Sequence, residues 1–266
     1  MSTVTANPWV HFPSPGTSAS LRLFCFPYAG GSAAAFRRWS KALPETVEVC
    51  PILLPGREAR LGEAAFSNVV PLLEALVPAL VPHLDKPFVL FGHSMGALVA
   101  FELARKLRRE HNSLPEHLFV SAREAPGFAL TQPLLSPLPD NDFIHELSRF
   151  NGSEQGALQH PELMKLMLPT LRADFALHER YQYLKEPALE CPITVFGGLQ
   201  DTAIEGEGLN AWRAHTSGSF VRRMFPGDHF FINSPSSFFL FTFSQELQRI
   251  IAAVRRQPAS DCACPA

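Results

Sequence analysis

Five short runs of mostly apolar residues are spaced along the chain and separated by longer stretches of mixed composition. The runs are Leu21–Phe26, Val47–Leu53, Phe88–Phe91, Leu118–Val120 and Ile193–Phe196. They do not alternate apolar with polar residues, as a strand with one face in water does. Continuous Val, Leu and Phe favour strands covered on both faces, so we expect a mostly parallel sheet between two layers of helices.

A helix is expected immediately after the third run. From Met95 to Arg109, apolar residues recur at every fourth position on one face, and the opposite face carries the charged residues Glu102, Arg105, Lys106 and Arg109. Residues 112–115 supply a stop signal. Strand and helix therefore follow each other directly, as in the right-handed crossovers that join parallel strands.

Residues 125–188 break the alternation of strands and helices. This segment opens with a proline-rich passage and then predicts short helices at 140–149, 160–167 and 169–184. A helical insertion between parallel strands must lie over the sheet edge at which ligands bind, so we interpret it as a lid. Residues 20–124 and 189–256 then form the α/β core, 1–19 an extended lead-in and 257–266 a flexible tail.

Composition excludes several classes of protein. Of the 266 residues, 46% are hydrophobic and 18% are charged, which is enough apolar material for a core. A net charge of −2 provides no field for binding nucleic acid. No apolar run is long enough to span a membrane, and the amino terminus lacks the pattern of a secretory signal. Five scattered cysteines suit a reducing compartment, so we expect a cytoplasmic protein.

The strongest chemical signal is the sequence GHSMG at residues 92–96. It follows a predicted buried strand and opens the predicted helix, which is the context of a nucleophile elbow. The tight turn requires glycine on both sides of a strained serine. The Ser94 hydroxyl is then expected to lie above the sheet at a helix N-terminus, where a developing negative charge is stabilised.

A serine needs a base that takes its proton and an acid that orients the base. In the order expected for this elbow, His229 is the best candidate base, because it follows a strand-like segment at 220–225 and precedes a final helix. Asp201, just beyond the fifth apolar run, is the preferred acid. Asp228 is the alternative, although its position next to His229 in sequence makes it hard for its carboxylate to reach the ring.

An oxyanion hole needs two backbone N–H groups directed at one point. Met95, after the candidate nucleophile, would supply one, and the loop after the first strand would supply the other. We assign the second donor to Ala29, with Tyr28 as the alternative. Pro27 has no N–H. Tyr28, Gly30 and Phe230 are the candidate substrate-binding residues.

These residues together predict acyl transfer but do not identify the acyl substrate. Esters, thioesters and amides pass through the same tetrahedral intermediate. A thioester expels a thiolate, whose conjugate acid has a pKa of about 8.5, so its departure needs little help from a general acid.

Five sequence phrases spread along the chain carry a family resemblance. They are FPYAGG at 26–31, LPGRE at 54–58, GHSMGA at 92–97, LPTLRADF at 168–175 and GDHFF at 227–231. In this order, from about residue 20 to 255, the chain resembles the type II thioesterases, the stand-alone α/β hydrolases that accompany polyketide and nonribosomal peptide synthetases. The resemblance implies an α/β-hydrolase fold with a helical lid. It places the catalytic residues at Ser94, Asp201 and His229 and the oxyanion donors at Ala29 and Met95.

The same resemblance implies a function. Such an enzyme removes acyl groups from the phosphopantetheine arm of acyl or peptidyl carrier proteins and clears stalled or wrongly primed synthetase modules. No cofactor or metal is expected, and we expect a monomer. One alternative is a chain-terminating thioesterase that releases a fatty or polyketide acid. Another is an inactive hydrolase scaffold that binds a synthetase.

Two positions depart from the family pattern. Ala122 stands where bacterial relatives often have glycine, and Pro78 lies in a helix that the family usually leaves unbroken. We expect the proline to kink the helix or to end it early. Arg172 and Asp174 are expected to fix the lid helix against the core.

Overall fold

Six parallel strands form one sheet in the computed structural model, which describes residues 7–10, 19–128, 133–150, 160–233 and 237–256. The strand order is β2-β1-β3-β4-β5-β6, and every pairing is parallel. The strands are β1 (Leu21–Phe26), β2 (Val47–Pro51), β3 (Phe88–His93), β4 (His117–Ser121), β5 (Ile193–Gly198) and β6 (Phe220–Phe225). The predicted parallel sheet is confirmed, and each apolar run coincides with a strand, except that Ile52 and Leu53 extend past the end of β2.

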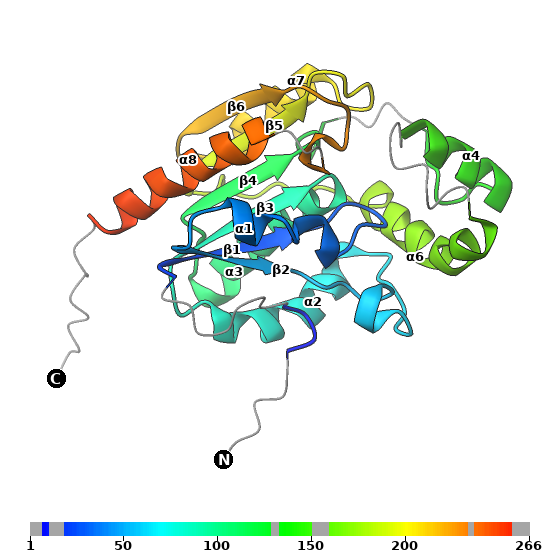
Figure 1. The fold of residues 1–266 in the computed structure, drawn as a ribbon, viewed down its shortest axis with the longest axis horizontal. Helices are drawn as coiled ribbons and strands as arrows, with labels where there is room; N and C mark the ends of the chain where they lie inside the picture. The colour runs from blue at the N-terminus through cyan, green and yellow to red at the C-terminus, as the bar shows by residue number, and fades with distance from the viewer. Residues whose placement is uncertain (1–6, 11–18, 129–132, 151–159, 234–236, 257–266) are drawn as a thin grey trace, which may run out of the picture.

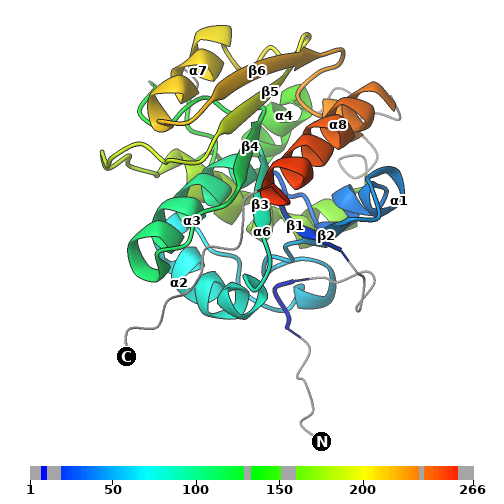
Figure 2. The ribbon, with the colours of Figure 1, turned by 90° about the vertical axis from the view of Figure 1, so that its left-hand side faces the viewer.

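Helices cover both faces of this sheet (Figure 1, Figure 2). The short α1 (Trp39–Ala42) and the long C-terminal α8 (Ser237–Val254) lie on one face, and α2 (Val69–Leu80) and α3 (Met95–His111) lie on the other. The short α7 (Gly206–Asn210) precedes β6. The chain runs from β1 outward to β2 and then returns to form β3 on the other side of β1, so the strand order reverses between β1 and β3. Ligands of open parallel sheets bind at such a reversal point.

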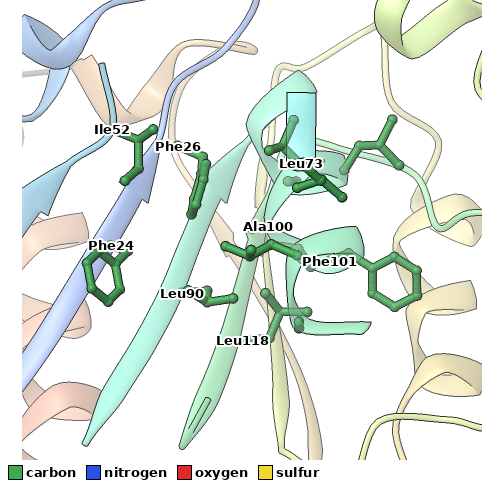
Figure 3. Packing of buried hydrophobic residues seen from close by; sticks show 14 of the residues in the cluster. Phe24, Phe26, Ile52, Leu73, Leu90, Ala100, Phe101 and Leu118 are labelled. Atoms are coloured by element: carbon green, nitrogen blue, oxygen red, sulfur yellow. The ribbon is translucent and has the colours of Figure 1, made fainter. Parts of the chain in front are cut away.

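Two hydrophobic clusters hold the helices onto the sheet. The face under α2 and α3 packs Phe24, Phe26 and Leu90 of the strands against helix residues such as Leu73 and Phe101 (Figure 3). The opposite face is rich in aromatic residues, with Phe91, Phe119 and Phe196 packed against Trp39 of α1 and against Phe239 and Phe243 of α8. Side chains are buried on both faces of β1 to β5, as their sequences predicted, whereas the edge strand β6 has exposed residues such as Val221 and Arg222.

The charged face of α3 is partly buried, in contrast to the solvent-exposed face that its pattern suggests. Arg105 forms an ion pair with Glu102 and donates to the carbonyl of Leu184 at 2.5 Å, and Arg108 donates to the carbonyls of Pro187 and Ala188. These bonds hold the extended segment after residue 180 along the helix. At its C-terminus, α3 ends on Asn112 in the left-handed conformation, as the stop signal predicted.

Two further helices, α4 (Asp140–Phe150) and α6 (Pro161–Glu179), lie beyond the ends of the strand arrows in Figure 1. The sequence predicted two helices at 160–167 and 169–184, which is wrong: α6 continues through Pro169 and ends at Glu179. The proline removes one backbone hydrogen bond, but packing of Met164 and Leu171 in a third hydrophobic cluster supports the helix on both sides of it. Similarly, α2 continues through Pro78 and ends two residues later.

Some predicted segments lie outside the described residues. These are most of the lead-in at 1–19 and the whole tail at 257–266. The lid assignment of residues 125–188 and the division into core and insertion stay predictions. In the part of the chain that the structure describes, no helix combines the length and apolar character needed to cross a membrane.

Candidate active site

Ser94 occupies a strained turn between β3 and α3. Its backbone has φ 52° and ψ −116°, a conformation that a residue with a side chain rarely adopts. Both flanking glycines are required by close approach of main chain: a Cβ at Gly92 would lie 2.1 Å from the Gly96 carbonyl oxygen, and a Cβ at Gly96 would lie 2.2 Å from that of Phe26. The local geometry is that of the nucleophile elbow that the sequence predicted.

The position of the Ser94 backbone is fixed by the neighbouring strand. Its N–H donates to the carbonyl of Ser121, at the end of β4, over 2.7 Å. The residue is half-buried. Among the described residues, its hydroxyl makes no side-chain hydrogen bond, to His229 or to any other group. A hydrogen bond between the Ser94 hydroxyl and His229 therefore requires a small rotation of the Ser94 side chain or the binding of a substrate.

The candidate base and the preferred acid are brought together. Nδ1 of His229 lies 2.8 Å from Oδ2 of Asp201, and the Asp201 side chain is almost fully buried. Since a carboxylate only accepts, a neutral His229 carries its proton on Nδ1 and presents Nε2 as a base. Asp228, the alternative acid, instead accepts the N–H of Phe230 at 2.9 Å. Geometry favours Asp201.

A second histidine links the elbow to the loop of His229. His93 is completely buried, its Nε2 lies 2.9 Å from the carbonyl oxygen of His229, and its Nδ1 lies 2.9 Å from the Ser121 hydroxyl. Burial, and secondarily the nearby His229, hold the pKa of His93 well below its usual value, so the ring is neutral. Nε2 therefore donates to the carbonyl, and Nδ1 accepts the hydroxyl proton of Ser121.

The loop after β1 is held by a buried ion pair. Asp174 of α6 accepts the N–H of Gly30 at 2.7 Å and pairs with Arg57 at 2.8 Å, and Arg57 also donates to the carbonyl of Gly31 at 2.8 Å. Burial raises the pKa of Asp174, and the positive charge of Arg57 opposes this effect. The N–H of Ala29, the residue before Gly30, belongs to this same fixed loop.

Two of the candidate substrate-binding residues, Tyr28 and Gly30, belong to this loop, and the third, Phe230, packs against it. Tyr28 packs edge-on against Phe230, with ring centroids 5.0 Å apart, and against His93. Its hydroxyl accepts a hydrogen bond from Asn233. Gly30 is covered by Leu171 of α6 and its N–H is bound to Asp174. A substrate role for Tyr28, Gly30 and Phe230 stays a prediction.

Sequence reasoning did not identify two sets of contacts as part of the site. These are the hydrogen bonds of His93 and the ion pair between Arg57 and Asp174. His93 and Ser121 were available as signals, because a polar side chain at the end of a fully buried strand needs a hydrogen-bond partner. Asp174 was expected to fix the helix to the core, and its pairing with Arg57 confirms this. Arg172 was expected to do the same, but it pairs with Asp140 of α4 instead.

Comparison with known proteins identifies the family. The sequence profile described as "Thioesterase domain" matches residues 21–245. The chain belongs to the thioesterase family. This thioesterase is 43% identical over 247 residues to the gramicidin S biosynthesis protein GrsT of Aneurinibacillus migulanus, and the match covers 93% of this chain and 96% of GrsT.

Solved structures of similar proteins agree with the thioesterase fold. RedJ, a thioesterase from the prodiginine biosynthetic pathway of Streptomyces coelicolor, superposes with a TM-score of 0.81 at 41% identity, over 86% of this chain and 87% of RedJ. BorB, a type II thioesterase from the borrelidin biosynthetic cluster, superposes with a TM-score of 0.83 at 32% identity, over 94% of this chain and 100% of BorB. The α/β-hydrolase prediction is therefore confirmed.

Proposed function

We propose that this thioesterase hydrolyses acyl thioesters carried on the phosphopantetheine arm of acyl or peptidyl carrier proteins and that it edits polyketide or nonribosomal peptide synthetase modules. The observation that carries the catalytic assignment is the 2.8 Å bond between Asp201 and His229, next to the strained Ser94 turn. The pathway assignment is supported by the names of GrsT, a gramicidin S biosynthesis protein, and of BorB, a type II thioesterase from the borrelidin biosynthetic cluster.

In the proposed reaction, the Ser94 hydroxyl attacks the thioester carbonyl carbon while Nε2 of His229 takes its proton. Asp201 accepts the Nδ1–H of His229 and stabilises the imidazolium that forms. The tetrahedral intermediate collapses, the C–S bond breaks, and the thiolate leaves with the proton from the imidazolium. Water, activated by the same histidine, then hydrolyses the acyl-serine and releases a carboxylic acid.

The negative oxygen of the intermediate is assigned to the N–H groups of Ala29 and Met95. Met95 is the first residue of α3, so its N–H is not used within the helix and adds to the positive end of the helix dipole. Ala29 precedes Gly30, whose N–H is fixed by Asp174. Preorganised donors of this kind contribute about 10²- to 10³-fold each to kcat.

The first test uses substitution of the proposed nucleophile and acid. Ser94→Ala is expected to lower kcat on an acyl carrier protein by about 10⁶-fold. Asp201→Asn is expected to lower it by about 10⁴-fold, because the base loses its orienting carboxylate. Asp228→Asn is the matched control and is expected to stay within about tenfold, since Asp228 only accepts the N–H of Phe230. If Asp228→Asn were the more damaging change, the acid would be misassigned.

The second test identifies the substrate class. Intact-mass spectrometry after brief exposure to acylated carrier protein is expected to show an acyl adduct that maps to Ser94. Acyl esters are expected to turn over more slowly than carrier thioesters, and faster ester turnover would contradict the proposal. A chain-terminating enzyme would prefer one long chain length, whereas the proposed editing enzyme gives a flat profile or favours short acyl groups.

A further inference from the structure

Arg123 lies at the sheet edge that carries the proposed site. It follows β4 by two residues, and Ser121, at the end of that strand, accepts the N–H of Ser94. The chain around it is fixed on both sides: the N–H of Ala122 donates to the carbonyl of Phe196 at 2.9 Å, and the carbonyl of Arg123 accepts from Nε1 of Trp212 at 2.8 Å. The root of the arginine side chain therefore has a fixed place next to the elbow.

Among the residues that the structure describes, the guanidinium of Arg123 has no bonded partner. The four buried arginines, Arg22, Arg57, Arg60 and Arg105, each pair with a carboxylate. Arg123 is half-buried, yet within the described part of the chain its guanidinium makes neither an ion pair nor a hydrogen bond. Burial lowers its pKa to about 10, which leaves it charged at neutral pH. A partly buried guanidinium without a bonded counterion is available to pair with an anion.

Against the larger effect of burial, the nearby Glu124 and Tyr181 raise the pKa of Arg123, but both form their hydrogen bonds with other groups. Glu124 accepts the N–H of Glu205 at 3.2 Å, and its side chain lies against Gly208. His178 of α6 has a pKa well below its usual value, first because of burial and then because the charges of Arg123 and His229 both reach it. His178 is therefore neutral, and it lies within electrostatic reach of both the arginine and the proposed base. Arg123 therefore keeps its own positive charge, and within the described residues no carboxylate is bonded to its guanidinium.

We propose that Arg123 binds an anionic group of the substrate, through paired oxygens of a carboxylate or a phosphate. The guanidinium fork matches both groups, and a charge-assisted contact in a partly desolvated place is strong and directional. A carboxylate would lie on the acyl chain, as in a dicarboxylic acyl group, and a phosphate would lie on the pantetheine arm. This inference rests on the proposed thioesterase function, because it assigns a role in substrate recognition to the same site.

The test compares three thioesters that differ only in their anionic group. Butyryl-pantetheine has none, succinyl-pantetheine carries a carboxylate on the acyl chain, and butyryl-4′-phosphopantetheine carries a phosphate on the arm. Arg123→Gln is expected to lower kcat/KM about 10- to 100-fold for one of the anionic thioesters and less than about threefold for the neutral one. Arg123→Lys is expected to retain part of that preference. The substrate that loses most identifies the source of the anion.

A control variant and the comparison of kcat/KM between thioesters separate a binding role of Arg123 from a structural one. Arg213→Gln removes a positive charge from an exposed position next to Trp212 and is expected to leave kcat/KM unchanged for all three thioesters. Because kcat/KM of each anionic thioester is divided by that of the neutral thioester in the same preparation, a change in the folded fraction cancels. An equal loss on all three thioesters, or no loss on any, overturns the inference while the function stands. If the wild-type protein hydrolyses none of them or any carrier thioester, the proposed function fails and the inference fails with it.

Discussion

At the scale of single residues, Ser121 has two roles in the proposed site. Its carbonyl fixes the N–H of Ser94, and its hydroxyl donates to His93, which in turn donates to the carbonyl of His229. One buried hydroxyl thus connects the turn of the proposed nucleophile with the loop of the proposed base. Because catalysis depends on the relative placement of these two side chains, a displacement of about 1 Å is enough to lower the rate 10²-fold.

His93→Phe tests this connection. The substitution keeps a ring of similar size but removes the donor to His229, so kcat is expected to fall about 10- to 100-fold with little change in KM. His117→Phe is the matched control, because His117 is another buried histidine, is bonded to Thr194 and lies at the start of β4. Both variants are expected to lose about 1 to 3 kcal/mol of unfolding free energy. Equal loss of kcat in the two would show that His93 acts only through stability.

Ala122 is a residue-scale departure from the family pattern, and its backbone explains the usual glycine. Its φ is 49°, in the left-handed region, which costs a residue with a Cβ about 1 to 2 kcal/mol. Ala122→Gly relieves that strain but loses a buried methyl group, worth about 0.8 kcal/mol, and gains entropy in the unfolded chain. The unfolding free energy is expected to change by less than about 1 kcal/mol.

Ala104→Gly is the comparison for Ala122→Gly. Ala104 is also fully buried but lies within α3. Its substitution loses a similar methyl group and about 1 kcal/mol of helix propensity, without any relief of strain. Urea denaturation is expected to show a loss of about 2 kcal/mol. If Ala122→Gly were as destabilising as Ala104→Gly, the left-handed backbone at 122 would carry no strain.

At the scale of elements, α6 is joined to the core at the loops after β1 and β2. Leu171 covers Gly30, the Thr170 hydroxyl donates to the Gly56 carbonyl at 2.9 Å, and Asp174 pairs with Arg57. Three of the five family phrases therefore meet in one joint, although they are far apart in the sequence. The joint fixes the loop that carries the proposed oxyanion donor Ala29.

Asp174→Asn is predicted to weaken this joint strongly. Asparagine still accepts the N–H of Gly30, but Arg57 is left as a buried cation without a counterion, and breaking such a pair costs about 3 to 5 kcal/mol. Arg172→Gln is the matched control on the same helix, since its partner Asp140 is exposed and the loss is expected near 1 kcal/mol. Urea denaturation of both variants checks the difference. If both variants lost a similar unfolding free energy, the Arg57–Asp174 ion pair would not be the contact that stabilises the joint.

At the scale of the whole molecule, the sequence was sufficient to predict the parallel sheet and the order of the candidate catalytic residues along the chain. Continuous apolar runs imply two covered faces, and the order nucleophile, acid, base that accompanies a nucleophile elbow pointed to Ser94, Asp201 and His229. The path of α6 through Pro169 and the partners of His93 and Arg57 were not predictable in this way. They depend on contacts between distant segments, whose energies outweigh local preferences such as that of proline.

Buried histidines make the stability of the whole molecule sensitive to acid. Burial lowers the pKa of His117 to about 4, whereas an unfolded chain binds this proton near pH 6.5. Its contribution to stability is therefore complete above pH 6.5 and is lost as the pH falls toward 4. Between pH 7 and 4.5, the wild type is expected to lose about 2 kcal/mol more than His117→Gln, measured by urea denaturation. If the unfolding free energies of the two proteins changed in parallel with pH, His117 would be excluded as a source of the acid sensitivity.

The third hydrophobic cluster has an evolutionary consequence. Phe143 and Leu147 of α4 pack on Met164 and Leu171 of α6 in a cluster separate from both clusters on the sheet. Mutations in α4 can therefore accumulate without disturbing the strands that hold the proposed catalytic residues. A lineage of such proteins is free to diversify this outer helix while it inherits the chemistry of the inner sheet unchanged.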